Sequence, residues 1–208
     1  MNPRPEAWTV VVQGAWNLRI FSPDWVAKNV FEGKPMTMDV AIGPFQVPVR
    51  YKSTSDGVTL TPSADRLVFG VVKADVTSML AAEAGAQRVL ALLKHTPIMA
   101  IGVNVGYYED TASEWVHKLF GMHDIDGLSH AGCDIKLSNI TRSVERNGDV
   151  INITIALDGE GRTEVLMNFH KETPSNEDAL ARLSGSAKSG IDGARELLTN
   201  AYGAILED

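Results

Sequence analysis

The feature that most constrains this chain is a run of three alternating segments in its second half. Residues 134–144, 150–157 and 163–170 each alternate apolar and polar side chains, which is the period of a β-strand. Asn147-Gly148 separates the first two segments, and such a pair supplies the positive φ angles of a tight hairpin turn. Three strands joined by short turns predict an antiparallel meander.

The two faces of this meander differ in polarity. One face is apolar and consists of Ile151, Ile153, Ile155, Leu157, Val165, Met167 and Phe169. The other face carries Asn152, Thr154, Asn168 and His170. An antiparallel sheet can pack one face on a core while the other meets water or polar contacts, and this pattern predicts such an arrangement.

The same periods predict the remaining elements. Further strands are expected over residues 8–13, 36–42, 45–51, 58–61, 66–72 and 98–108. Helices are expected over residues 23–31, 77–94 and 112–120, and along an apolar stripe from 180 to 205 that glycines interrupt near 184–190. Pro44 and Pro48 cannot donate to a strand ladder, so the segment around them is predicted to be an edge strand or a bulged pair.

These elements predict the fold class. We expect an α+β fold with antiparallel sheet, including the C-terminal meander, and three or four helices packed on it. Residues 1–208 are expected to form a single domain, because single domains often reach this length. Two half-domains meeting near residues 109–133 are the alternative, although no internal repeat is visible in the sequence.

Composition and charge exclude several classes of protein. The chain is 44% hydrophobic and 22% charged, which is typical of a globular protein. A net charge of −7 argues against a nucleic-acid partner, since such binding depends on basic residues that neutralise phosphates. No apolar stretch is long enough to span a bilayer, so no membrane association is expected. The single cysteine and the lack of a signal-peptide pattern favour a cytoplasmic location.

Residues 117–136 concentrate groups that could form a metal or catalytic site. They contain three histidines, three aspartates and the only cysteine: His117, His123, His130, Asp124, Asp126, Asp134 and Cys133. Their spacing matches no compact zinc motif, and the aspartates and glycines suit a surface loop. No metal or cofactor is therefore assigned, and whether His123, Asp124, His130 and Cys133 converge is left open.

The strand predicted at 98–108 has one face with almost no side chains. Ala100, Gly102, Asn104 and Gly106 alternate with bulky residues, and glycines in a strand often mark the close approach of another segment. We expect the approaching segment to be a helix of the same domain, which would make Asn104 a buried hydrogen-bonding residue. The alternative is that Asn104 contacts a ligand.

Aromatic residues cluster near the N-terminus: Trp8, Trp16, Phe21, Trp25 and Phe31. Tryptophan is enriched at the energetic centres of interfaces, so this cluster could be a docking or self-association surface. The alternative is a satellite core, because large aromatic side chains are usually buried.

No constellation of residues in the sequence has the pattern of a known catalytic site. We therefore expect a non-enzymatic interaction or assembly protein that binds protein partners and forms a homo-oligomer, with a composition suggestive of a bacterial or phage protein. The surfaces expected to make these contacts are the sheet edges, the aromatic N-terminal segment and the C-terminal helix. The alternative is a small-molecule-binding protein or a metal-dependent hydrolase. Its site would lie between the 100–106 strand and the 121–133 loop, with Asn104, His123, Asp124 and His130 as ligand-binding residues.

Overall fold

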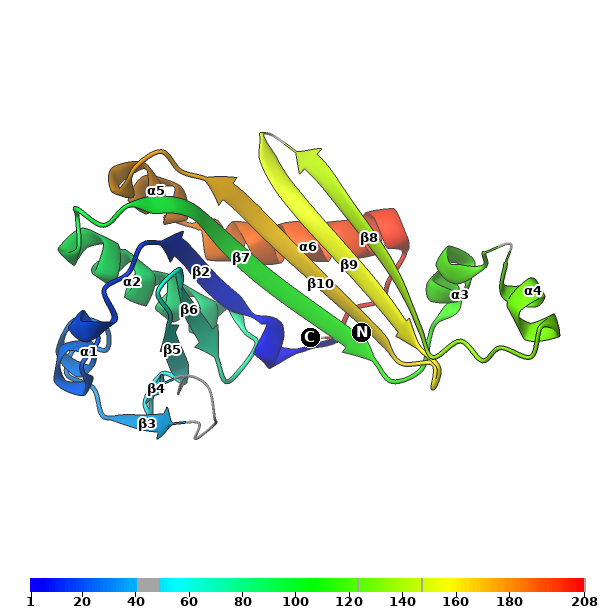
Figure 1. The fold of residues 1–208 in the computed structure, drawn as a ribbon, viewed down its shortest axis with the longest axis horizontal. Helices are drawn as coiled ribbons and strands as arrows, with labels where there is room; N and C mark the ends of the chain where they lie inside the picture. The colour runs from blue at the N-terminus through cyan, green and yellow to red at the C-terminus, as the bar shows by residue number, and fades with distance from the viewer. Residues whose placement is uncertain (41–48, 123, 147, 208) are drawn as a thin grey trace.

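The structure, a computed structural model, describes residues 1–40, 49–122, 124–146 and 148–207. Its strands form one antiparallel sheet in the order β3-β4-β5-β6-β2-β7-β10-β9-β8, and β1 pairs with the end of β7 (Figure 1). The strands are β1 (Asn2–Pro3), β2 (Thr9–Gly14), β3 (Met36–Val40), β4 (Val49–Ser53), β5 (Val58–Pro62), β6 (Arg66–Val71), β7 (Ile98–Glu109), β8 (Leu137–Arg146), β9 (Asp149–Asp158) and β10 (Thr163–Glu172).

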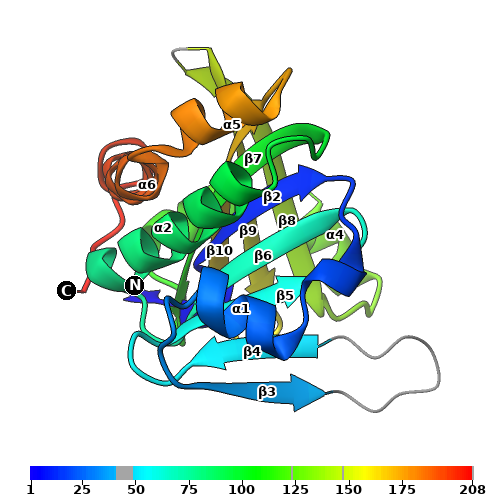
Figure 2. The same ribbon diagram turned by 90° about the vertical axis from the view of Figure 1, so that its left-hand side faces the viewer.

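The long helices cover one face of this sheet. Along the chain the helices are α1 (Pro23–Asn29), α2 (Val76–Leu92), α3 (Glu114–Phe120), α4 (Ile125–His130), α5 (Asn176–Leu183) and α6 (Ser186–Tyr202). Helices α1, α2, α5 and α6 lie on that face, whereas α3 and α4 lie beyond one end of the sheet (Figures 1 and 2). Two 3-10 turns, η1 (Pro5–Ala7) and η2 (Leu18–Ile20), complete the described elements. The α+β fold and the C-terminal meander, β8 to β10, are therefore confirmed.

None of the helices in the described ranges is both long and apolar enough to cross a membrane.

Local sequence signals explain where the helices begin and end. Ser22 accepts a hydrogen bond from the Trp25 backbone N–H at the start of α1, as its position before Pro23 predicts. Gly185 has a φ of +78° and separates α5 from α6, which confirms the predicted break. Helix α3 begins two residues later than predicted, after Ser113, whose N–H and hydroxyl both bind the Glu109 carboxylate.

Two predicted turn features lie wholly or partly beyond the described residues. Pro44 and Pro48 fall outside them, so the predicted edge at these prolines stays a prediction. Asn147 also falls outside, but Gly148 has the positive φ of +81° that its hairpin turn requires.

The order of elements along the chain repeats within the fold. Each half begins with a central strand (β2 or β7), continues into a meander that returns beside that strand (β6 or β10), and ends in a helix of 17 residues (α2 or α6). Strands β2 and β7 pair antiparallel in the middle of the sheet. The two halves are therefore related by an approximate two-fold axis between these strands, and the chain crosses from one to the other at residues 93–97.

Core side chains follow this two-fold relation. Phe69, Val10, Val103 and Phe169 face one another in a row across β6, β2, β7 and β10, so the row reads the same from either end. A Cβ at Gly85 in α2 would lie 3.3 Å from the Phe69 ring. In α6, a Cβ at Gly193 would lie 3.0 Å from the Phe169 ring, so each helix crosses its phenylalanine at a glycine.

The buried faces of α2 and α6 match when these two glycines are aligned. Buried Ala82, Ala86 and Leu90 then coincide with buried Gly190, Ala194 and Leu198. The two halves share the pattern of buried positions but not the residues that occupy them, so no repeat is visible in the sequence.

Glu83 of α2 joins the halves at the start of α6. Its side chain is only 5% exposed, and its two carboxyl oxygens accept hydrogen bonds from the backbone N–H groups of Gly185 (2.8 Å) and Ala187 (2.7 Å). The first N–H groups of a helix have no partner within the helix. Glu83 supplies that partner from the other long helix.

Candidate binding face

Over most of its width, the sheet face opposite the long helices is left uncovered by the described part of the chain (Figure 1). We call it the open face. Its side chains are half-buried or exposed and come from five neighbouring strands: Thr9, Val11, Gln13, Asn104, Leu166, Asn168, His170, Asn152, Thr154, Thr141 and Ser143. They are mostly amides and hydroxyls, whereas the helix-facing residues of the same strands are mostly aliphatic.

A continuous row of hydrogen-bonded side chains crosses the middle of the open face. Asn152, Asn168, Asn104 and Thr9 stand directly opposite one another on β9, β10, β7 and β2. The Nδ2 of Asn152 donates to Oδ1 of Asn168 (3.3 Å), and Nδ2 of Asn168 donates to Oδ1 of Asn104 (2.8 Å). The Nδ2 of Asn104 donates in turn to Oγ1 of Thr9 (2.8 Å). We call these four residues the polar row.

The polar row keeps unused hydrogen-bonding capacity. An asparagine amide has two N–H donors and an oxygen with two lone pairs. Each bond along the row uses one donor and one lone pair, so Asn104 and Asn168 each retain one donor and one lone pair beyond the row. These free groups belong to half-buried side chains, and they can meet a ligand on the open face.

A hollow of about 440 Å³ lies beside the polar row. The turn η1 and the residue before it contribute Arg4, Glu6 and Ala7 to its lining, and Asn104 and Thr154 contribute from the sheet. Other lining residues are Thr9, Ala156, Glu164, Val165 and Leu166.

Glycine allows η1 to lie this close to the sheet. A Cβ at Gly106 would be 2.3 Å from Cβ of Ala7, which is far inside van der Waals contact. Gly102, the other glycine of the strip, is approached by Nδ2 of Asn168, 3.0 Å from where a Cβ would stand. The expectation that a long helix covers this strip was therefore wrong, because α2 and α6 pack on the opposite side of β7. A 3-10 turn and a side chain of the polar row approach it instead.

The charged groups around the hollow neutralise one another. Arg4 forms ion pairs with Glu164 and Glu6, and a second guanidinium, Arg162, lies 3.6 Å from the Glu164 carboxylate. Arg162 also lies over the ring of Tyr108, 5.3 Å from its centroid. The remaining polar side chains of the hollow are amides and hydroxyls, which neither gain nor lose protons near neutral pH. Such groups suit recognition of a ligand better than transfer of its protons.

The structure separates Asn104 from the other predicted ligand-binding residues. Asp124 precedes α4 and His130 is its last residue, and both side chains are exposed. Helix α4 projects beyond the end of the sheet, and the hollow that Asn104 lines includes neither residue (Figure 1). His130 contacts the backbone carbonyl of Asp126 through Nδ1 at 2.6 Å. His123 lies outside the described residues.

Cys133 has an exposed thiol. It lines a different hollow of about 790 Å³ together with Ser129 and Asp134. Within the described ranges, which omit His123, no three or more His, Cys, Asp or Glu side chains lie close enough together to hold a metal ion.

The N-terminal aromatic residues belong mainly to the core. Trp8, Trp16, Phe21 and Phe31 are at most 6% exposed, and Trp25 is half-buried. Trp16, Phe21 and Trp25 form successive edge-to-face contacts, with ring centroids 6.1 and 5.4 Å apart. The four buried side chains have almost no surface to offer a partner, which corrects the hypothesis of an aromatic interface. The satellite-core alternative describes them instead.

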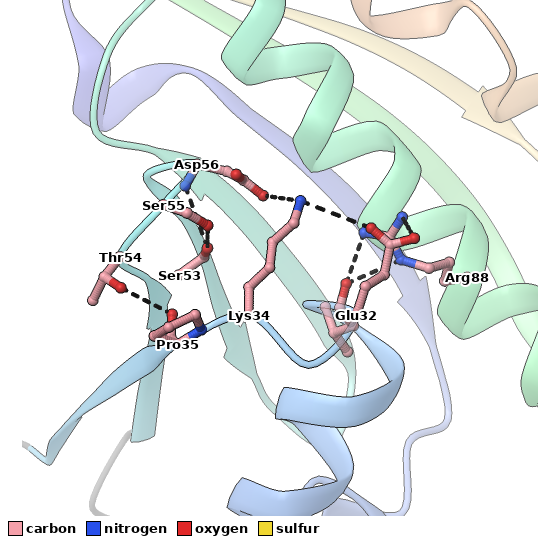
Figure 3. A network of polar contacts seen from close by, with 9 residues as sticks. Glu32, Lys34, Pro35, Ser53, Thr54, Ser55, Asp56 and Arg88 are labelled. Carbon is pink, nitrogen blue, oxygen red and sulfur yellow. Dashed lines mark hydrogen bonds and ion pairs between the residues drawn. The ribbon is translucent and has the colours of Figure 1, made fainter.

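The polar network in Figure 3 has a structural role. Lys34 bonds Asp56 at 2.7 Å, and Arg88 of α2 donates to the carbonyl oxygen of Val30 at 2.7 and 3.0 Å. Arg88 also lies 3.4 Å from Glu32, which has a φ of +55° at the end of α1. Because the hydrogen bond from Lys34 favours the ionised form, the pKa of Asp56 is lowered. These contacts fasten α1 to α2 and to the turn between β4 and β5.

Sequence reasoning identified Asn104 as a possible contact but missed its partners. Asn152 and Asn168 were on the polar side of predicted strands, and Thr9 lay within the strand predicted over residues 8–13. Their alignment depends on the register of β10 with β7 and of β7 with β2, and long stretches of chain separate β2 from β7 and β7 from β10. Only turn-connected strands have a register that a sequence can reveal.

A scan of the sequence against protein-family models gave no match, and a search of curated proteins gave none.

Proposed function

We propose that this chain is a non-enzymatic binding protein and that its ligand lies on the open face, over the polar row and in the adjoining hollow. The observation that carries the proposal is the polar row, whose hydrogen bonds leave one donor and one lone pair free on Asn104 and on Asn168. These free groups lie beside a hollow of about 440 Å³. This volume is within the usual range for small-molecule sites.

The chemistry of the hollow favours an uncharged, polar ligand. Amide groups offer donors and acceptors in equal measure, so they match ligands that themselves carry both, such as amides, alcohols and sugars. A strongly charged ligand would have to compete with the ion pair between Arg4 and Glu164 beside Asn104. Leu166, which is 42% exposed, offers an apolar contact at the same place.

Nuclear magnetic resonance tests this proposal even while the ligand is unidentified. The ¹⁵N-labelled chain is titrated with a set of small neutral amides, alcohols and monosaccharides at millimolar concentration. We expect the largest shifts at the side-chain amides of Asn104 and Asn168 and at the backbone of η1. In an Asn104→Leu variant these shifts should disappear.

A matched control separates the site from a general effect of losing an amide. Asn139 lies on β8, faces the open face and is exposed, but it does not line the hollow. Asn139→Leu should leave the shifts unchanged. The proposal fails if the strongest shifts map to the hollow around Ser129 and Cys133, or if Asn104→Leu binds the probes as the unaltered chain does.

A further inference from the structure

We propose that the outer edge of β8 is a self-association surface, at which β8 of a second copy adds antiparallel and joins the two sheets. Strand β8 ends the sheet, and none of the described strands pairs with its outer edge. It is regular over ten residues, and none of these residues is buried. A long exposed edge presents a row of backbone donors and acceptors that can bind another strand.

The internal repeat shows what this edge lacks. In the first half, β4, β5 and β6 lead back to the central strand, and β3 pairs along the outer edge of β4. In the second half, β8, β9 and β10 follow the same course, so β8 occupies the position of β4. No described strand takes the position of β3 beside β8. The fold therefore accommodates one more strand there without rearrangement of the rest.

The side chains of β8 restrict how two copies can pair. Around a two-fold axis, each residue faces one at an equal distance on the other side of the central residue. A pairing centred on Arg142 would set this arginine against itself, and one centred on Val144 would set Arg142 against Arg146. Like charges directly opposite each other destabilise a strand pair, so both registers are disfavoured.

A pairing centred on Ser143 avoids these clashes. It sets Arg142 opposite Val144, Ile140 opposite Arg146, and Thr141 opposite Glu145. It also brings Ser143 of both copies together, and Ser143 stands opposite Asn152 at the end of the polar row. The open faces of two copies would then share one uninterrupted line of amides and hydroxyls.

A second copy suits this edge better than the short strand β3 at the far side of the sheet. Strand β8 is ten residues long and β3 is five, and β8 pairing with β8 closes into a dimer. Pairing of β8 with β3 of another copy would instead leave a free edge at each end and continue into a filament. A contact limited to one strand is small for a stable interface, so we expect weak, concentration-dependent association.

Sedimentation of the full chain over a range of concentrations tests the proposal. We expect a monomer–dimer equilibrium. Ser143→Lys and Ser143→Glu each place a charge against its own copy, so each should raise the dimer dissociation constant roughly fivefold or more. An equimolar mixture of the two variants should restore dimerisation, since opposite charges then meet at the centre.

Thr37→Lys is the matched control, because Thr37 is an exposed residue of the other terminal strand, β3. It should dimerise as the unaltered chain does, and circular dichroism should show that all three variants are folded. A monomer at every concentration would overturn the proposal, as would a dimer insensitive to both Ser143 substitutions. Filament growth blocked by Thr37→Lys would assign the association to β3 and overturn it equally. Probe binding at Asn104, measured on the unaltered chain at a concentration at which it is monomeric, tests the open-face function separately.

Discussion

Single residues determine how the long helices α2 and α6 pack on each other and on the sheet. Glu83 is buried between α2 and the start of α6, and it bonds two backbone N–H groups that no other described residue reaches. Gly85 and Gly193 leave room for the rings of Phe69 and Phe169. In each case a helix residue contacts a group that is distant in the sequence. Its role therefore follows only from the three-dimensional structure.

Replacing Glu83 should be costly. In Glu83→Ala, the N–H groups of Gly185 and Ala187 lose their acceptors, and the free energy of unfolding should fall by about 3 kcal/mol. Glu83→Gln keeps one amide oxygen as an acceptor, so its cost should be about half as large. Urea denaturation of the three proteins measures both values. A Glu83→Ala protein as stable as the unaltered chain would show that these bonds do not hold α6.

Asp56 should make stability depend on pH. Its pKa is lowered in the folded protein, chiefly by the hydrogen bond from Lys34, so its contribution is present above the ordinary carboxyl pKa near 4 and is lost as the pH falls through the lowered value. The pair is partly exposed, and we expect Asp56→Asn to cost about 0.5 kcal/mol at pH 7 and less at pH 2. Thermal or urea unfolding at the two pH values measures this difference.

Lys34→Met provides the control for Asp56. With the lysine removed, Asp56→Asn should have almost no effect at either pH. An unchanged effect in that background would assign the pH dependence to a group other than Lys34.

At the scale of elements, local patterns predicted most strands and helices. The three meander strands lie within three residues of their predicted bounds, and Ser22-Pro23 marked the start of α1. Helix α4 was missed because it has six residues, includes Gly127 and buries no side chain, so it carries no apolar stripe. Pairing between distant strands could not be predicted either, because alternation assigns a residue to a face but does not identify its partner on another strand. The polar row depends on such pairing, so it could not be predicted.

Helix α4 and its flanking residues should be the first part of the chain that proteases attack. Between residues 121 and 136, Ile125 and Ile135 are half-buried and every other described residue is exposed. Thermolysin cleaves before bulky apolar residues, so brief digestion should cut before Ile125 or Leu128. The fragments should remain associated, because the sheet and core do not depend on this segment. First cleavage within the sheet would contradict this expectation.

At the scale of the whole molecule, the two halves share their core and their central strand pair. The buried apolar side chains form one cluster that includes residues from Met1 to Ala204. Strand β2 of the first half pairs with β7 of the second, and Glu83 of α2 binds the start of α6. Neither half can lose its structure without exposing apolar surface of the other, which is the condition for cooperative unfolding.

Tryptophan fluorescence can test this cooperativity. Trp115→Phe leaves Trp8, Trp16 and Trp25, all in the first half, as reporters, while far-ultraviolet circular dichroism reports the entire chain. We expect the two urea transitions of this variant to coincide. A fluorescence transition distinct from the circular dichroism transition would show that the halves unfold separately.

The bonds of the polar row all run the same way, with each amide donating toward β2. Such a chain behaves as an aligned set of dipoles, in which each link polarises the next. The two ends of the row therefore differ. Reversing one amide within the row would break the hydrogen bonds on both sides of it. A ligand that itself has a donor end and an acceptor end would find two unequal orientations along the row. Beyond selecting its ligand by polarity, the open face would select the ligand's direction.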